Sequence, residues 1–134
     1  MNYLDYAATT PVNAEVLEVI TKEMASFGNP SSVYRIGREQ KQKIERVKKA
    51  ILSELQASPH DAIIFTSSGS EGNNLVFESI REHFANEKGH IIVSAVEHPS
   101  VRKSAEFLEQ EGFDVTYLTP NKDGIVTVSE VEQA

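Results

Sequence analysis

The segment from Ile63 to Asn74 combines the residue types that bind anions. A β-prone run, Ile63-Ile64-Phe65, leads through Thr66 into the small residues Ser67-Ser68-Gly69-Ser70, and a helical pattern follows. Backbone N–H groups at a helix N-terminus lack intrahelical partners and favour negative charge. Gly69 would let the backbone approach a ligand closely, and the Ser70 hydroxyl can donate a hydrogen bond. The pattern therefore indicates a site for a phosphate group.

Two nucleotide-binding motifs do not fit this segment. No Lys-Ser or Lys-Thr follows Gly69, as a Walker loop requires, and the Gly-x-Gly-x-x-Gly dinucleotide fingerprint is missing. A polar loop between a strand and a helix, with a serine as the N-cap, would have the same composition. The residue types alone leave the phosphate site and the capped loop about equally supported.

His98 is the second candidate for chemistry. Glu97 and His98 follow the predicted strand His90–Ala95, and ligand sites of open α/β sheets lie beyond the C-terminal ends of strands. An imidazole there could stack on an aromatic cofactor or transfer protons near neutral pH. The alternative is a surface histidine that caps a helix locally. The remaining histidines, His60, His83 and His90, have no partner at metal-ligand spacing, so we expect no metal site.

Hydrophobic periodicity predicts the elements that position these residues. Short β-prone runs alternate with helical ones after Ala62, which predicts an α/β fold with a mostly parallel sheet flanked by helices. The lysines of the second predicted helix, Lys41, Lys43, Lys48 and Lys49, are expected on a solvated face. Helices are predicted at 14–26, 38–55, 70–86 and 100–111, and strands at 62–66, 90–95 and 113–118.

The last residues predict a further helix. A turn at Asn121–Gly124 precedes the short run Ile125–Val128, and Ser129-Glu130-Val131-Glu132 fits a capping box. A helix of about one turn is not stable by itself. We therefore expect a truncated chain, with a disordered natural tail as the alternative.

Composition excludes several classes of function. A formal net charge of −7 disfavours nucleic acid as a partner. No apolar run approaches the roughly 20 residues that span a membrane, and Met1–Asp5 does not resemble a signal peptide. These features predict a cytoplasmic protein without a membrane partner. With 0 cysteines, these residues offer no disulfide, thiolate metal ligand or thiol nucleophile.

Four motifs follow one another along the chain: Tyr3–Pro11, Gly28–Ser32, Phe65–Asn74 and Glu97–Val101. In this order they resemble the NifS/IscS-type cysteine desulfurases, a branch of the class V aminotransferase family with the type I pyridoxal-phosphate-dependent transferase fold. The resemblance implies that Gly69 and Ser70 hold the phosphate of pyridoxal 5'-phosphate. It also implies that His98 stacks on the pyridine ring and can assist proton transfer, and that Ala7–Thr10 lines the substrate side.

By the same resemblance, residues 1–13 form an extended arm, 14–61 a helical segment and 62–134 the first part of the cofactor-binding large domain. The family converts L-cysteine to L-alanine and an enzyme-bound persulfide, and donates the sulfur for iron–sulfur clusters or tRNA thiolation. A homodimer and a sulfur-acceptor protein, either a scaffold or a thiolation enzyme, are implied. The alternatives are another class V aminotransferase, such as a selenocysteine lyase, and a non-catalytic phosphate-binding fragment.

Some features depart from the family. Tyr34 stands where relatives usually carry histidine, and Ser68-Gly69-Ser70 replaces the commoner Gly-Ala-Thr. The Schiff-base lysine and the nucleophilic cysteine are absent, so these 134 residues alone are expected to be inactive. In the family the strand at Ala62–Thr66 pairs with later sequence; here it would lack a partner, which predicts marginal stability, oligomerisation or a companion chain.

Overall fold

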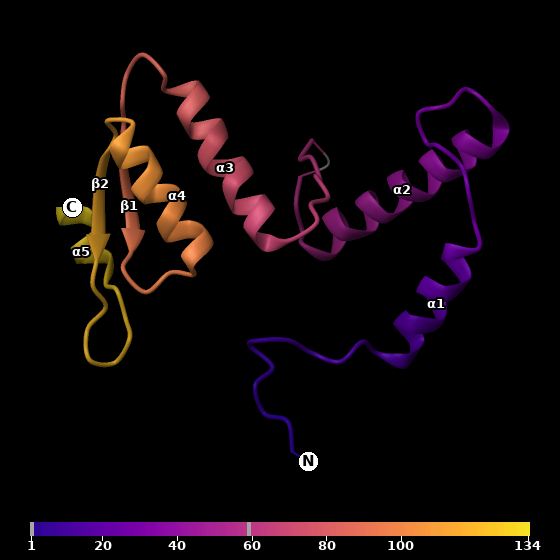
Figure 1. Ribbon diagram of the computed structural model, residues 1–134, viewed down its shortest axis with the longest axis horizontal. Coiled ribbons are helices and arrows are strands. Elements are labelled where there is room, and N and C mark those ends of the chain that lie inside the picture. The colour runs from indigo at the N-terminus through magenta and orange to yellow at the C-terminus, as the bar shows by residue number, and fades with distance from the viewer. Residues whose placement is uncertain (1, 59) are drawn as a thin grey trace. The chain divides into compact units, whose positions relative to one another are not determined.

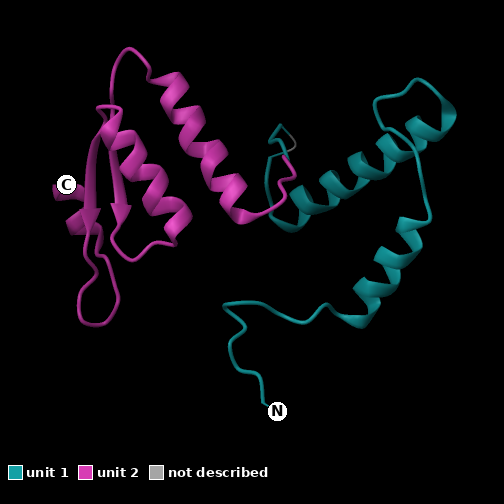
Figure 2. Cartoon of the chain, in the orientation of Figure 1, with its two compact units in different colours: residues 1–63 teal, residues 64–134 magenta. Residues whose placement is uncertain are grey.

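The computed structural model describes residues 2–58 and 60–134. Met1, which belongs to the predicted arm, and Pro59, which belongs to the predicted segment 14–61, lie outside the described residues. The chain forms two compact units, Met1–Ile63 and Ile64–Ala134 (Figure 2).

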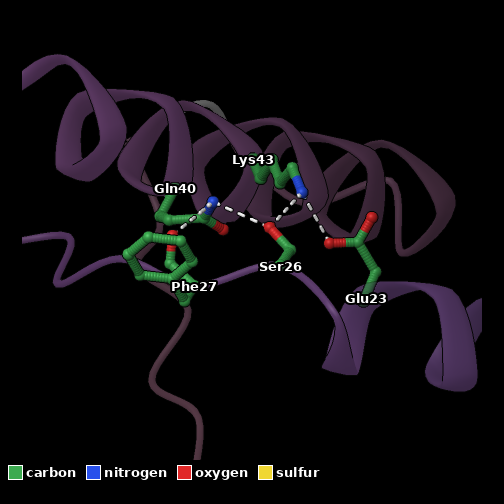
Figure 3. Close-up of polar contacts among 5 residues, drawn as sticks. All are labelled: Glu23, Ser26, Phe27, Gln40 and Lys43. Atoms are coloured by element: carbon green, nitrogen blue, oxygen red, sulfur yellow. Dashed lines mark hydrogen bonds and ion pairs between the residues drawn. The ribbon is translucent and has the colours of Figure 1, made fainter.

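The first unit contains two helices, α1 (Ala14–Met24) and α2 (Arg35–Glu54). Asn13 is the N-cap of α1, and its side chain accepts a hydrogen bond from Glu15 N–H. Polar side chains join the end of α1 to the middle of α2 (Figure 3). Lys43 Nζ lies 2.6 Å from Glu23 Oε2 and 3.2 Å from Ser26 Oγ. Lys43, on the face predicted to be solvated, is half-buried here because α1 supplies it with a carboxylate partner.

The loop between these helices packs on the first turn of α2. Gly28 has a φ of 149°, a left-handed conformation that favours glycine. Asn29 O accepts hydrogen bonds from Ser32 N at 3.0 Å and from Ser32 Oγ at 2.9 Å. Gly37 is buried beneath this turn, where a Cβ atom would lie 2.4 Å from Asn29 O. Only a glycine lets the loop approach α2 this closely.

The second unit is built around a βαβ unit. It contains α3 (Gly69–His83), β1 (His90–Ser94), α4 (Pro99–Gln110), β2 (Asp114–Leu118) and α5 (Val128–Gln133). β1 and β2 are parallel, in a register that pairs His90 with Asp114 and Ser94 with Leu118. In Figure 1, α4 lies along the strand pair and α3 lies beside α4, as the contacts between these elements also show. Val93, Ala105, Leu108 and Phe113 form the buried apolar core.

The prediction of a strand at Ala62–Thr66 is wrong for this structure. In the described part of the chain the sheet has two strands, β1 and β2, which pair with each other. A β-prone run forms a strand only when a neighbour satisfies its backbone groups. Ile64 and Phe65 are exposed, at 70% and 57%. This segment is therefore a connection to α3 without regular secondary structure.

The last helix begins earlier than the sequence predicts. Thr127, not Ser129, is the N-cap of α5, and Glu130 completes the capping box in place of Glu132. Thr127 has the extended backbone that an N-cap requires, with φ −87° and ψ 156°. The predicted short run Ile125–Val128 therefore contains the N-cap and the first residue of α5. The boundaries of the other predicted helices and strands differ from the observed ones by at most three residues.

No helix within residues 2–58 and 60–134 is long and apolar enough to cross a membrane. Those residues also include no group of three or more histidine or acidic side chains that could hold a metal ion.

Candidate functional site

The loop that enters α3 is closed by its own side chains. Ser68 is the N-cap, with extended backbone, and its Oγ accepts from Glu71 N–H at 3.2 Å. Glu71 turns back over the loop, and its Oε2 accepts from Ser67 N at 2.6 Å and from Ser67 Oγ at 2.5 Å. Thr66 Oγ1 donates to Ser68 O at 3.0 Å. These bonds hold residues 66–71 in one conformation. The alternative interpretation, a polar loop with a serine as the N-cap, is therefore also confirmed.

Gly69 and Ser70 remain available to a ligand. They are the first residues of α3, where backbone N–H groups have no intrahelical acceptor, and no other acceptor for them occurs among the described residues. A Cβ atom added to Gly69 would meet nothing within 4 Å, so open space lies beside the backbone at this point. Two free donors, a hydroxyl and the positive end of a helix fit a phosphate group.

His98 is the N-cap of α4. Its Nδ1 accepts from Ser100 N–H at 3.1 Å and lies 2.8 Å from Ser100 Oγ. Local capping, the alternative that the sequence left open, is therefore what the structure shows. Capping occupies only Nδ1: no partner for Nε2 occurs within the described part of the chain. The exposed ring is free to contact a ligand with its other nitrogen and with its faces.

A groove of about 790 Å³ between α3 and α4 brings Ser70 and His98 together. Both helices begin at the same end of this groove. Asn73 of α3 contacts Ser100 in the first turn of α4, and the next residue, Asn74, contacts Ser104 one turn further along α4. Gly69 adjoins Ser70 but does not line the groove. The sequence-predicted residues thus come from two different connections, the loop into α3 and the β1–α4 connection, and Ser70 and His98 line the same groove.

The two carboxylates that line the groove, Glu71 and Glu78, both have local partners. Hydrogen bonds from the Ser67 side chain and then its backbone lower the pKa of Glu71. Glu78 is paired with Arg81, whose hydrogen bond lowers the pKa of the Glu78 carboxyl. Lys103 is the basic side chain that lines the groove. An anion entering here would meet backbone donors and one lysine, while both carboxylates are engaged elsewhere.

Sequence reasoning missed a polar network behind His98. Asn73 Nδ2 donates to Ser100 Oγ at 2.9 Å, and Ser104 Oγ lies 2.8 Å from both Asn74 Oδ1 and Ser100 O. Ser104 is 8% exposed. Adjacent asparagines inside a predicted helix are a usable signal, since asparagine is a poor helix former and needs a reason to be there.

Two other features that the sequence singled out lie in the first unit. The Ala7–Thr10 loop is held by Tyr3, whose hydroxyl donates to Thr9 O at 3.0 Å. Tyr34 is the N-cap of α2, makes no side-chain capping bond and is 74% exposed. Nothing in the structure explains the choice of tyrosine there.

A phosphate-compatible loop at the start of one helix, followed by a histidine at the C-terminal end of a parallel strand, is typical of cofactor-binding α/β enzymes. The family model "Aminotransferase class-V" matches residues 2–134, and this chain belongs to that family. The match confirms the resemblance to this family that the sequence motifs indicated.

Individual relatives define the branch. The chain is 41% identical over 133 residues to the cysteine desulfurase IscS of Dictyoglomus turgidum, covering 98% of this chain and 34% of that protein. It is similar to the solved structure "SspA in complex with cysteine", with a TM-score of 0.92, 40% identity and coverage of 100% of this chain and 39% of the other. A "NifS-like protein" structure gives a TM-score of 0.87 at 32% identity, covering 96% and 35%. The chain thus spans about a third of the length of these proteins.

Proposed function

We propose that this chain supplies the phosphate-binding loop and the ring-stacking histidine of a pyridoxal 5'-phosphate-dependent cysteine desulfurase. The observation that carries the proposal is the free pair of N–H groups at Gly69 and Ser70, at the same end of the groove as His98. Groups that can bind a phosphate and a side chain that can stack on an aromatic ring therefore lie at the same end of one groove.

Each residue has a separate role. Gly69 and Ser70 bind the phosphate through backbone N–H groups and the Ser70 hydroxyl, which are strong donors to an anion. His98 covers one face of the pyridine ring and can carry protons through its free nitrogen. Glu71 holds the loop in its binding conformation through Ser67. When bound, the cofactor supplies an electron-withdrawing ring that stabilises negative charge on the substrate carbon.

The proposed reaction takes L-cysteine and a protein thiol to L-alanine and a persulfide. The C–S bond of the substrate breaks, a proton joins its β-carbon, and the thiol sulfur bonds to the departing sulfur. These 134 residues contain no cysteine, so the thiol is supplied by residues outside them. We propose that the persulfide sulfur passes to an acceptor protein for iron–sulfur clusters or tRNA thiolation, and that the complete protein is a cytoplasmic homodimer. These parts rest on family membership and on the names of the relatives.

Binding of pyridoxamine 5'-phosphate, measured by isothermal titration calorimetry, tests the site. This compound has the ring and phosphate but no aldehyde, so it cannot react with surface lysines. Ser70→Ala should lower its affinity about tenfold or more, because a hydrogen bond to a charged group is worth about 1.5–3 kcal/mol. Ser79→Ala is the matched control: Ser79 is also on α3 but bonds to Leu75 O of its own helix. Equal binding by wild type and Ser70→Ala would refute the assignment.

The activity is tested on the complete gene product. Incubation with L-cysteine should yield equal amounts of L-alanine and transferred sulfur. A selenocysteine lyase would instead release alanine from L-selenocysteine while leaving L-cysteine intact. Failure to bind the cofactor analogue at all would favour a non-catalytic phosphate-binding role or none.

A further inference from the structure

The hydrogen bonds at His98 determine which ring nitrogen carries the proton. Ser100 N–H donates to His98 Nδ1 at 3.1 Å. A peptide N–H can only donate, so Nδ1 must present its lone pair. In the neutral ring, the proton is then on Nε2. Ring orientation and tautomer are thus linked to the capping of α4.

The Ser100 hydroxyl also favours the form of His98 that carries its proton on Nε2. Asn73 Nδ2 donates to Ser100 Oγ at 2.9 Å, which engages one lone pair of that oxygen. The hydroxyl has a single proton, and His98 Nδ1 lies 2.8 Å away as an acceptor. The donors therefore run from Asn73 through Ser100 to His98. Ser104 Oγ, 2.8 Å from Ser100 O, helps to fix the backbone that carries this serine.

We propose that Ser100, supported by Asn73, is a positioning residue that holds His98 as the Nε2–H tautomer. His98 then presents a hydrogen-bond donor, and not a base, on the side of the ring away from the helix end. A ligand atom facing it must be an acceptor, such as a carboxylate or phenolate oxygen. His98 can take up a proton at Nε2 only after it has given one away. The inference rests on the proposed function, since a ligand in the groove is what makes the donor useful.

Nitrogen-15 NMR of histidine-labelled protein without cofactor tests the proposal. The His98 signals are identified by their loss in His98→Gln, and the spectrum is taken at a pH where the ring is neutral. The wild type should show a protonated Nε2 and an unprotonated Nδ1. Ser100→Ala should lower the ratio of Nε2–H to Nδ1–H tautomers about fivefold, the effect of one hydrogen bond of ordinary strength. Ser100→Thr, which keeps the hydroxyl, should restore the ratio.

Asn73→Asp provides a sharper variant because it keeps the size of the side chain. A carboxylate would accept the Ser100 proton, so the hydroxyl would turn its lone pairs toward His98 and the Nδ1–H form should increase. A wild-type His98 protonated on Nδ1 would overturn the proposal, as would a tautomer ratio unchanged in both Ser100→Ala and Asn73→Asp.

The tautomer is measured without cofactor, so its result is separate from that of the proposed function. If pyridoxamine 5'-phosphate fails to bind while the Nε2–H form and its dependence on Ser100 are observed, the positioning role stands and the cofactor assignment falls. If the analogue binds through Ser70 but His98 is protonated on Nδ1, the proposed function stands and the positioning role falls.

Discussion

Replacing Gly37 by alanine should separate the loop at residues 28–32 from α2. A Cβ atom at this position would lie 2.0 Å from Ser32 Oγ, 2.4 Å from Asn29 O and 3.0 Å from Ser32 O. The serine hydroxyl could rotate away, but the two carbonyl oxygens belong to the backbone. The loop must therefore move, or α2 must shift beneath it.

The expected loss of stability follows from opposing effects. Overpacking a tight contact costs about 1–3 kcal/mol, and lifting the loop instead gives up its two bonds to Asn29 O, which together stabilise by about 2 kcal/mol. Alanine regains about 1 kcal/mol over glycine through its higher helix propensity. The net change for Gly37→Ala is a loss in the free energy of unfolding of about 1 kcal/mol if the loop lifts, and of up to about 2 kcal/mol if the contact is overpacked.

Urea unfolding followed by circular dichroism measures the net change in the free energy of unfolding. Hydrogen exchange of the Ser32 amide measures how far the loop has opened, because that amide donates to Asn29 O at 3.0 Å. Gly72→Ala is the matched control. Its Cβ would meet only Thr66 Oγ1 at 3.6 Å, an ordinary contact, so it should stabilise by up to about 1 kcal/mol. If Gly37→Ala proved as stable as the wild type and left Ser32 protected, the close packing of this loop on α2 would be wrong.

Further predictions concern the second unit. The hydrogen bonds from Ser67 lower the pKa of the Glu71 carboxyl in the folded protein. The stability they contribute is therefore complete above the unfolded carboxyl's pKa of about 4.3 and is lost as the pH falls through the lower folded pKa. The Ser67 amide resonance should report this titration, and Glu71→Gln should abolish it. Ser104→Ala should cost about 1–2 kcal/mol in thermal unfolding, because it leaves Asn74 Oδ1 without its donor, whereas Ser100 O keeps the backbone N–H of residue 104 within α4. Tyr117→Phe should instead raise the free energy of unfolding in urea by up to about 1 kcal/mol, since the buried hydroxyl makes no hydrogen bond of ordinary geometry among the described residues. A loss of stability would show that the nearby Glu109 carboxylate accepts a hydrogen bond from it.

The elements around the site could be predicted from local patterns. β1 and α4 form where buried Val93 and the apolar stripe of Ala105 and Leu108 require them. The helix start at Gly69 follows from Ser68, whose side chain caps it. Such features depend on residues close together in sequence, so the sequence contains the information needed to find them.

The errors arose where distant or competing partners decide the outcome. The β-prone run at Ala62–Thr66 has no strand to pair with in the described part of the chain. The local pattern predicts a strand there, and only the family resemblance indicated that its neighbour would be missing. Thr127 and Ser129 are both acceptable N-caps by residue type. The helix begins after Thr127 because Glu130 bonds to it twice: Thr127 N–H donates to the Glu130 carboxylate, and Glu130 N–H donates to Thr127 Oγ1. The bond from Asn73 to Ser100 joins residues 27 apart, so it depends on how α3 packs against α4.

The most direct test of the cofactor site is the amide chemical-shift change on adding pyridoxamine 5'-phosphate to nitrogen-15-labelled protein. We expect the largest changes at the Gly69 and Ser70 amides, with changes at the His98 ring, and their loss in Ser70→Ala. The basic residues Arg38, Lys41 and Arg46, which line a separate hollow on α2, provide an internal comparison for non-specific anion binding. Largest changes at those residues, with Gly69 and Ser70 unaffected, would contradict the proposed site.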